Sequence, residues 1–363
     1  DRTQYIIDSL STTGTANSSC SASAIASGWC TSVQNPNRGD WTGTISTDGA
    51  DRYNTQTKST SIYLLDSIEF NPQWLLDLGI RWDKFDTEQT MIAGRYNSTY
   101  SEGIITRAES DTDFINYQAG LTFKPVENGS IYASFATSAN PVGIDAGDGS
   151  EAIGANYSNL DPEESRTFEL GTKWDLFNDR LNLTAAIFRT EKQNARIQLD
   201  TTTYANIGES KVDGLELGLN GKITEKWDIS AGYTYLDSEA TKNGVSCRGT
   251  TCTDQSIYNG NQLPNVPKNR ATLWTTYQVM PKLTLGTGAV AMDKVYGDLA
   301  NTKWVPGYVR YDAMARYNVN KNVDVQLNVN NLSDKRYFTK AYASHYATEA
   351  EGRNAVLAVN FKY

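Results

Sequence analysis

Apolar and polar residues alternate with a period of two through most of this chain. From Trp74 to Trp82 every second residue is apolar, whereas the alternate positions 77, 81 and 83 are charged. Val323 to Asn330 shows the same pattern, with Val or Leu at the odd positions and polar residues at the even ones. Successive side chains of a β-strand point to opposite faces. Each block therefore predicts a strand with one apolar face and one polar face.

Blocks of this kind recur along the chain and predict about thirteen strands. The connections between them alternate in length, with short turns such as Asn178-Asp179 followed by long segments. This alternation is typical of a transmembrane β-barrel, whose turns lie at the periplasmic rim and whose loops are extracellular. The strand centres fall near residues 65, 79, 119, 134, 170, 185, 216, 232, 274, 287, 312, 327 and 357, and the long segments cover about 9–58, 88–111, 140–163, 190–210, 238–267, 293–306 and 332–350.

Aromatic residues gather close to the short turns, where the interfacial girdle of a barrel belongs. A soluble β-sandwich also shows alternation. The charged faces opposite the apolar ones and the regular order of turns favour the antiparallel transmembrane β-barrel. The aromatic residues in question are Phe70, Trp74, Phe123, Phe177, Trp227 and Tyr317.

The composition agrees with this class of membrane protein. No stretch approaches about 18 uncharged apolar residues, so the sequence predicts no transmembrane helix. Only 39% of the residues are hydrophobic and the mean hydropathy is −0.51, as expected where lipid-facing residues alternate with polar ones. An aromatic content of 11% argues against disorder. The net charge of −9 argues against a nucleic-acid binder, which would show a basic face.

The four cysteines form two local pairs, Cys20 with Cys30 and Cys247 with Cys252, each inside a predicted long loop. Zinc is the competing interpretation, but the spacings differ from paired Cys-x-x-Cys knuckles and the chain has a single His. Two disulfides formed in an oxidising compartment fit better. The chain begins without Met or a signal peptide, so we expect processing or a piece of a longer protein.

The last eleven residues, 353–363, alternate in the same way and end on an aromatic residue. Phe361 and Tyr363 lie on the apolar face of this segment. The pattern resembles the C-terminal signal by which the barrel assembly machinery recognises outer-membrane barrels for insertion.

Residues 59–363 resemble TonB-dependent outer-membrane siderophore receptors. Leu160–Lys173 is similar to the family's L-x-P-E-x-S-x-x-x-E-x-G-x-K strand, Asn206–Glu216 to its N-x-G-x-x-x-x-x-G-x-E stretch, and Asn328–Tyr337 to its N-x-x-N-L-x-D-K-x-Y motif. The segments 263–267 and 341–347 look most like the catecholate group of these receptors.

This resemblance implies a barrel of about 22 strands closed by an N-terminal plug domain, of which this chain would hold about thirteen C-terminal strands and no plug. Residues 1–58 would be the end of a strand and a long extracellular loop with a disulfide, and residues 59–363 the barrel strands. The implied function is TonB-coupled import of a ferric siderophore across the outer membrane of a Gram-negative bacterium. No enzyme activity, cofactor, metal site or nucleic-acid partner is expected. The implied partners are the ferric siderophore, TonB through the missing N-terminal region, outer-membrane lipid and lipopolysaccharide, and the barrel assembly machinery.

A ferric tris-catecholate carries three negative charges inside an aromatic shell, so its site needs cations and aromatic rings. The net charge of −9 opposes an anionic ligand. Cations of the loops must override it, or the plug must supply them. The predicted ligand-binding residues in the long loops are Arg95, Tyr96, Arg107, Arg248, Trp304, Lys340, Tyr342, His345 and Tyr346.

Other functions remain open at this point. A passive porin-like channel would need an open lumen and no plug, and an adhesive outer-membrane protein would use its loops on host surfaces. Within the receptor family, hydroxamate siderophores, haem and cobalamin are alternative ligands. Haem is disfavoured because haem receptors usually need more than one His and this chain has only His345.

Overall fold

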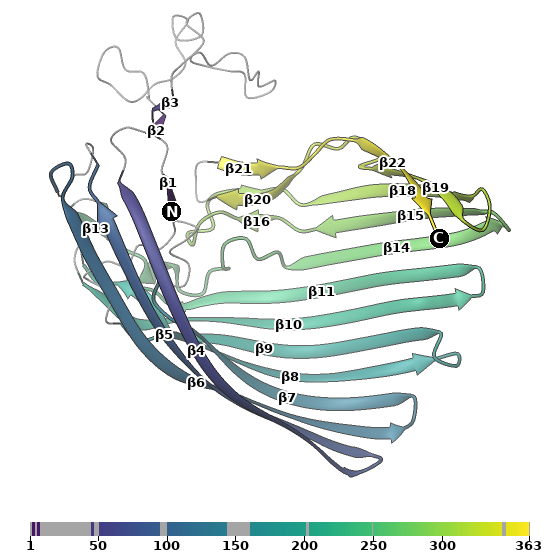
Figure 1. Ribbon diagram of the computed structural model, residues 1–363, viewed down its shortest axis with the longest axis horizontal. Helices are drawn as coiled ribbons and strands as arrows, with labels where there is room; N and C mark the ends of the chain where they lie inside the picture. Colours follow the sequence, from purple (N-terminus) through teal and green to yellow (C-terminus); the bar gives the residue numbers. More distant parts are fainter. Residues whose placement is uncertain are drawn as a thin grey trace, which may run out of the picture. The chain divides into compact units, whose positions relative to one another are not determined.

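The computed structural model describes residues 51–94, 100–143, 160–200, 203–248, 250–342 and 346–362, together with three two-residue strands nearer the N-terminus (Figure 1). These are β1 (Arg2–Thr3), β2 (Ile6–Ile7) and β3 (Ile45–Ser46). The chain forms two compact units. Asp1–Ser59, Phe85–Thr112 and Val142–Asn159 make up the first, and Thr60–Lys84, Asp113–Pro141 and Leu160–Tyr363 the second.

Thirteen consecutive strands of the described residues follow β1 in one hydrogen-bonded sheet. Neighbouring strands from β6 to β22 pair antiparallel. The strands are β4 (Arg52–Asn71), β5 (Trp74–Ile92), β6 (Ile105–Val126), β7 (Gly129–Asn140), β8 (Glu163–Leu176), β9 (Leu181–Gln198), β10 (Tyr204–Thr224), β11 (Trp227–Lys242), β14 (Asn269–Met280), β15 (Leu283–Met292), β18 (Tyr308–Asn318), β19 (Val323–Asn330) and β22 (Asn354–Phe361).

Each of the thirteen predicted centres falls inside one of these strands, and the six short turns are where the sequence predicts them. The predicted long connection over 190–210 is wrong, because β9 and β10 leave only residues 199–203 between them. The halves of β9 and β10 next to this connection are mostly polar on both faces of the sheet. The backbone ladder extends the strands there without an apolar face, so the alternation that marks the other strands is missing.

One face of the sheet in the second unit is apolar and exposed. Val323 pairs with Phe361, and Leu327 pairs with both Leu357 and Ala315, so apolar residues of three strands stand in register. Leu327 is 41% exposed and Leu357 67% exposed. A continuous exposed apolar surface of this kind marks contact with lipid or another apolar partner, and the predicted common face of the odd positions 323–329 is confirmed.

Aromatic rings border this apolar face at two levels. Near the short turns, the rings of Trp74 and Phe123 lie 4.6 Å apart. About six residues further along the strands, Phe135 stacks between Tyr117 and Phe168, with centroid distances of 5.7 and 4.4 Å. The two levels match the aromatic girdles that flank the lipid-facing band of a transmembrane barrel.

The opposite face of the sheet is polar, and several of its charges are paired. Arg316 binds Asp324 at 3.0 Å. The Tyr132 hydroxyl donates to Glu169 at 2.6 Å, and the Lys173 ammonium lies 5.1 Å from the Tyr132 ring centroid. Among the described residues, every buried side-chain nitrogen or oxygen has a hydrogen-bond partner. The polar face therefore supports itself by ion pairs and hydrogen bonds between neighbouring strands.

The first unit contains the start of β4, where Arg2 of β1 pairs with Tyr53. The Gln89 amide donates to the Thr55 hydroxyl at 3.0 Å, and the Gly94 amide donates to the Asp51 carboxylate at 2.8 Å. No helix in the part of the chain that the structure describes is long and apolar enough to cross a membrane.

Replacing Leu327 with Arg should lower the free energy of unfolding by about 2–4 kcal/mol, because Arg on the lipid-facing side near the midplane is destabilising by that amount. Leu327 lies four residues, or roughly 13 Å, along β19 from Val323 at the short-turn end. Asn328→Arg, one position along on the polar face, is the matched control and should cost much less. Urea unfolding of the full-length protein in lipid vesicles measures both values, and equal losses would contradict the assignment of the faces.

Candidate ligand-binding site

Three long connections pack together into a loop assembly, made of residues 259–268, 293–307 and 331–353. Two small hairpins form its centre. β16 (Val295–Tyr296) pairs with β17 (Trp304–Val305), and β20 (Phe338–Tyr342) pairs with β21 (Tyr346–Glu349). Val295, Val305 and Ala341 are buried against one another and join the hairpins.

Asn265 ties the first of these connections to the other two. Its side-chain oxygen accepts a hydrogen bond from the Ala341 amide at 2.9 Å, and its own amide donates to the Tyr296 carbonyl at 2.9 Å. Asn265 has a φ of +59°, a left-handed conformation that Asn tolerates better than most residues. The segment 263–267, which resembles catecholate receptors in sequence, therefore connects the other two parts of the loop assembly through Asn265.

Asn331 anchors the last connection to the sheet. It is 1% exposed, and its amide donates to the Asp312 carboxylate at 2.8 Å. Its side chain donates to the Lys335 carbonyl at 2.8 Å and accepts from the Lys335 amide at 2.9 Å. The N-x-x-N-L-x-D-K-x-Y motif thus holds the loop that carries Lys340, Tyr342 and Tyr346.

The Tyr that ends this motif connects the loop to the polar face of the wall. Tyr337 is 5% exposed and stacks on Tyr308, with 4.2 Å between the ring centroids. Its hydroxyl accepts a hydrogen bond from Arg310 at 3.2 Å, and Arg310 in turn binds Asp312 at 2.8 Å. Ring stacking and a charge-assisted hydrogen bond fix both tyrosines.

Arg270 lies in the same row of the polar face as Tyr308. Arg270 pairs in register with Met292, and Met292 pairs with Tyr308, so the three share one row on the polar face. Arg270 lies close enough to act electrostatically on the Tyr308 hydroxyl. We call the following group the wall cluster: Lys268, Arg270, Lys294, Tyr296, Tyr308, Arg310 and Tyr337.

Two lysines extend the wall cluster toward the loop assembly. The Lys294 ammonium lies 4.8 Å from the Tyr296 ring centroid. Lys268 and Lys294 both line a cavity of about 500 Å³, whose wall also includes Asp237 and Asp293. The Lys268 ammonium is 3.8 Å from Asp237. Cations and aromatic rings therefore adjoin one another, as an anionic aromatic ligand requires.

The sequence analysis missed Arg270, Tyr308 and Arg310 as site residues. All three lie in strands, where a cation or a tyrosine on the polar face looks the same as any other. Only the register between β14, β15 and β18 brings them together. No signal within a single strand could have selected them.

The predicted ligand-binding residues are divided between several places. Trp304 is 57% exposed opposite Tyr296 in the small β16–β17 sheet, and Lys340 is exposed on β20. Tyr342 and Tyr346 pair with each other in the adjoining hairpin. The loop assembly therefore unites four of the nine. Arg107 is an exposed residue of β6 in the first unit, and Arg95, Tyr96, His345, Cys20, Cys30 and Tyr363 lie outside the described residues.

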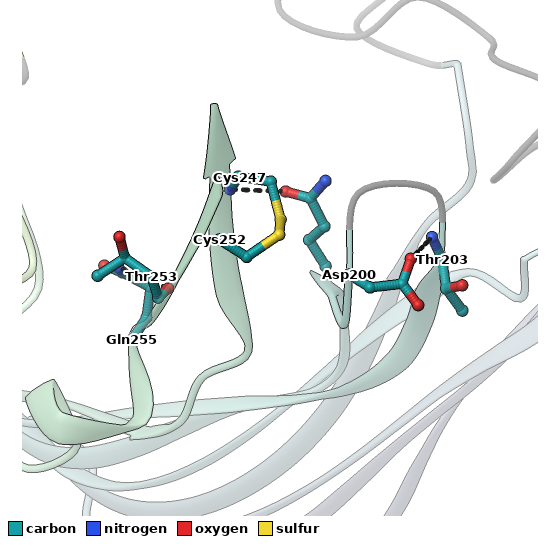
Figure 2. The surroundings of a disulfide bond; sticks show 7 residues. Asp200, Thr203, Cys247, Cys252, Thr253 and Gln255 are labelled. Carbon is teal, nitrogen blue, oxygen red and sulfur yellow. Dashed lines mark hydrogen bonds between the residues drawn. A yellow bond between two sulfur atoms is a disulfide. The ribbon is translucent and has the colours of Figure 1, made fainter. Parts of the chain in front are cut away.

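Arg248 belongs to a separate hairpin closed by a disulfide. β12 (Val245–Arg248) pairs with β13 (Thr251–Asp254), and the bond between Cys247 and Cys252 confirms that predicted pair (Figure 2). Figure 2 shows the hairpin beside the turn that carries Asp200 and Thr203. The Cys247 amide donates to the Gln198 side chain at 3.3 Å. Hydrogen bonds from the Ser256 side chain and amide lower the pKa of Asp254 at the end of the hairpin.

The other two motifs fix the ends of β8, β9 and β10. Glu163 is 8% exposed and accepts from the Lys192 ammonium and the Arg196 amide at 2.6 and 2.8 Å. Asn206 donates to the carbonyl oxygens of Asp161 and Asn194, both at 2.9 Å. Glu163 and Asn206 therefore hold the ends of these strands in place.

Comparison with known proteins places the chain in a family. Residues 5–332 match the model of the TonB dependent receptor-like β-barrel. The chain is 65% identical over 360 residues to the "Probable TonB-dependent siderophore receptor PiuA" of Acinetobacter baumannii, covering 99% of this chain and 47% of that protein. It is 31% identical over 355 residues to the "Catecholate siderophore receptor Fiu" of Escherichia coli K12, covering 91% of this chain and 45% of that protein.

Solved structures agree with the sequence comparison. The crystal structure of the siderophore receptor PiuA from Acinetobacter baumannii superposes with a TM-score of 0.87 at 67% identity, covering 93% of this chain and 48% of that one. The closed form of the ferric-catecholate import receptor Fiu from E. coli K12 gives a TM-score of 0.76 at 30% identity, covering 91% and 48%.

The chain therefore belongs to the TonB-dependent receptor β-barrel family, and the predicted resemblance is confirmed. Members of this family are outer-membrane receptors of Gram-negative bacteria and not enzymes. The polar face of the sheet is the lumenal face of such a barrel and the apolar face meets lipid. The chain spans about half the length of the curated relatives it matches.

Replacing Asn331 with Ala should loosen the last loop, because removal of a buried partner leaves polar groups unsatisfied at a cost of about 1–3 kcal/mol. Asn331→Asp is the matched variant, since it keeps the acceptor for the Lys335 amide and loses only the donor. Limited proteolysis of residues 331–353 in the full-length protein should accelerate more for Ala than for Asp. Equal cleavage of wild type and Asn331→Ala would contradict the anchoring role.

Reducing the Cys247–Cys252 disulfide should loosen its own hairpin and leave the sheet intact. The ring it closes is short, with a sequence separation of 5, so the lost constraint is worth about 2 kcal/mol. Mass analysis of the peptide before and after reduction should show a gain of two hydrogens. Hydrogen exchange over residues 243–255 should then rise while β9 and β11 stay protected. A free thiol at either Cys in protein taken from the outer membrane would contradict the prediction.

Proposed function

We propose that this chain is part of the wall and loops of a receptor that imports a ferric siderophore, with a catecholate as the ligand class. The observation that carries the proposal is the wall cluster, which extends from the strands β14 and β18 on the lumenal face into the loop assembly that also carries Trp304, Lys340, Tyr342 and Tyr346. The name of the siderophore receptor PiuA supports a siderophore as the ligand, and the name of the catecholate siderophore receptor Fiu supports a catecholate.

The chemistry of the two groups of residues suits this ligand. A ferric tris-catecholate presents anionic oxygens and aromatic edges, which Arg or Lys and tyrosine rings can bind together. The loop assembly contains further cation–aromatic contacts, such as Arg336 over the Phe338 ring at 5.9 Å. Local clusters of this kind can attract an anion although the chain as a whole has a net charge of −9.

The remaining partners follow from the same proposal. TonB, the general partner of this family, would supply the energy for import. The exposed apolar face would contact outer-membrane lipid and lipopolysaccharide. The last strand, which ends at the 65% exposed Phe361, would present the insertion signal to the barrel assembly machinery.

Replacing Lys340, Tyr342 and His345 together with Ala in the full-length receptor should weaken binding and uptake of a ferric tris-catecholate. Each lost charge-assisted hydrogen bond should cost about 1.5–3 kcal/mol if it is buried in the complex. Uptake of radioactive iron at limiting ligand, together with equilibrium binding to purified receptor, measures the effect. Lys340 is exposed on the β20–β21 hairpin, so its replacement should leave the fold intact.

Lys321→Ala is the control, because Lys321 lies on the short turn between β18 and β19 at the opposite rim. It should leave uptake unchanged. Normal uptake by the triple variant would contradict the role of these three residues and would assign ligand capture to other loops or to the plug. A wild-type receptor that binds only a hydroxamate, haem or cobalamin would refute the catecholate ligand, and uptake without TonB would favour a passive channel.

A further inference from the structure

Arg270 is the exception among the arginines of residues 160–363. Nine arginines in this range have described side chains, and eight of them form an ion pair with an Asp or Glu. Arg270 forms no side-chain hydrogen bond or ion pair within the described part of the chain, and it is exposed. Because the other eight arginines of this range are all paired, the unpaired guanidinium of Arg270 needs an explanation.

The row in which Arg270 stands offers it no acid. Its register partners are Thr234 on β11 and Met292 on β15, neither of which is charged. Glu216 lies beyond Thr234, two strands away, and forms no ion pair with Arg270. Two inter-strand spacings amount to about 10 Å, and among the described residues no acid of this row forms an ion pair with the guanidinium.

The other side of the row offers an aromatic partner. Tyr308 lies two strands from Arg270, beyond Met292, and is half-buried. The Tyr337 ring stacks on it. Arg310 is already engaged by Asp312 and the Tyr337 hydroxyl, so its donors are largely used. Arg270 thus offers a planar donor fork without an ion pair, and the Tyr308 ring of the same row lies close enough for an electrostatic interaction with it.

We propose that Arg270 is a ligand-binding residue of the lumenal wall and selects anionic catecholates over neutral iron complexes, an inference that rests on the proposed function. Its guanidinium donates to catecholate oxygens, while Tyr308 packs against the catechol edge. A ferric tris-catecholate carries three negative charges, whereas a ferric tris-hydroxamate is neutral. The unpaired positive charge therefore favours the first ligand and gives the second no comparable advantage.

The test measures equilibrium binding to the full-length receptor in detergent by intrinsic tryptophan fluorescence. The probes are the Fe(III) complex of a synthetic hexadentate tris-catechol and the neutral Fe(III) complex of a linear tris-hydroxamate. The variants are Arg270→Gln, Arg270→Lys, and the control Lys222→Gln. Lys222 also lies on the polar face, in β10 close to a short turn. Its variant therefore removes one positive charge from the same wall, far from Arg270.

We expect Arg270→Gln to weaken tris-catecholate binding at least tenfold, which corresponds to about 1.4 kcal/mol. Arg270→Lys should fall between wild type and Gln, since it keeps the charge and loses the fork. Lys222→Gln should stay within twofold of wild type, and any binding of the tris-hydroxamate should not change in any variant.

Each other outcome has a definite meaning. Unchanged tris-catecholate binding by Arg270→Gln, with a wild-type receptor that binds it, overturns the role of Arg270 and leaves the proposed function standing. Equal losses in Arg270→Gln and Lys222→Gln overturn it as well, because they reveal a general charge effect. A wild-type receptor that binds no tris-catecholate overturns the proposed ligand class and this inference with it.

Discussion

Every backbone amide and carbonyl at the level of the lipid must find its partner inside the protein, because the bilayer core offers no water. The rest of this structure depends on that constraint. Strand follows strand in antiparallel register, and pairs such as Leu327 with Leu357 align the apolar residues on one face. The lipid-facing surface and the polar lumenal wall are two sides of the same hydrogen-bonded ladder.

The lumenal side of the ladder carries many charges, and the protein neutralises most of them locally. Arg316 with Asp324 and Arg310 with Asp312 are pairs within the wall. Pairing limits the cost of placing charges on a confined surface and leaves little net field along most of the wall. Arg270 differs from these paired residues because its charge is available to bind an anionic group that is not part of the wall.

The family motifs build the scaffold on which the binding surface rests. Asn331 and Tyr337 attach the last loop to the sheet, and Asn265 joins that loop to its neighbours. Glu163 and Asn206 do the same for the ends of β8 to β10. Buried, fully hydrogen-bonded polar residues fix loop positions strongly, since leaving any of these groups unpaired would be costly. Trp304 and Lys340, which are exposed, are left available for the ligand contacts proposed above.

The sequence by itself determined the strands, their two faces and the alternation of short turns with long connections. It did so because side chains of a strand alternate with a period of two, and lipid enforces that period on the outer face. The same rule failed at the long-connection ends of β9 and β10. There both faces are mostly polar, and only backbone pairing identifies the residues as strand. It also paired Cys247 with Cys252 correctly, because closeness in sequence sufficed there.

Only the tertiary structure decided which residues meet. The hairpins that carry Trp304 and Lys340 come together because they share a small core of Val295, Val305 and Ala341. Arg270 and Tyr308 are 38 residues apart and come together through the register of β14, β15 and β18. Register depends on contacts between strands, and the alternation within one strand holds no record of which residue lies opposite on the next.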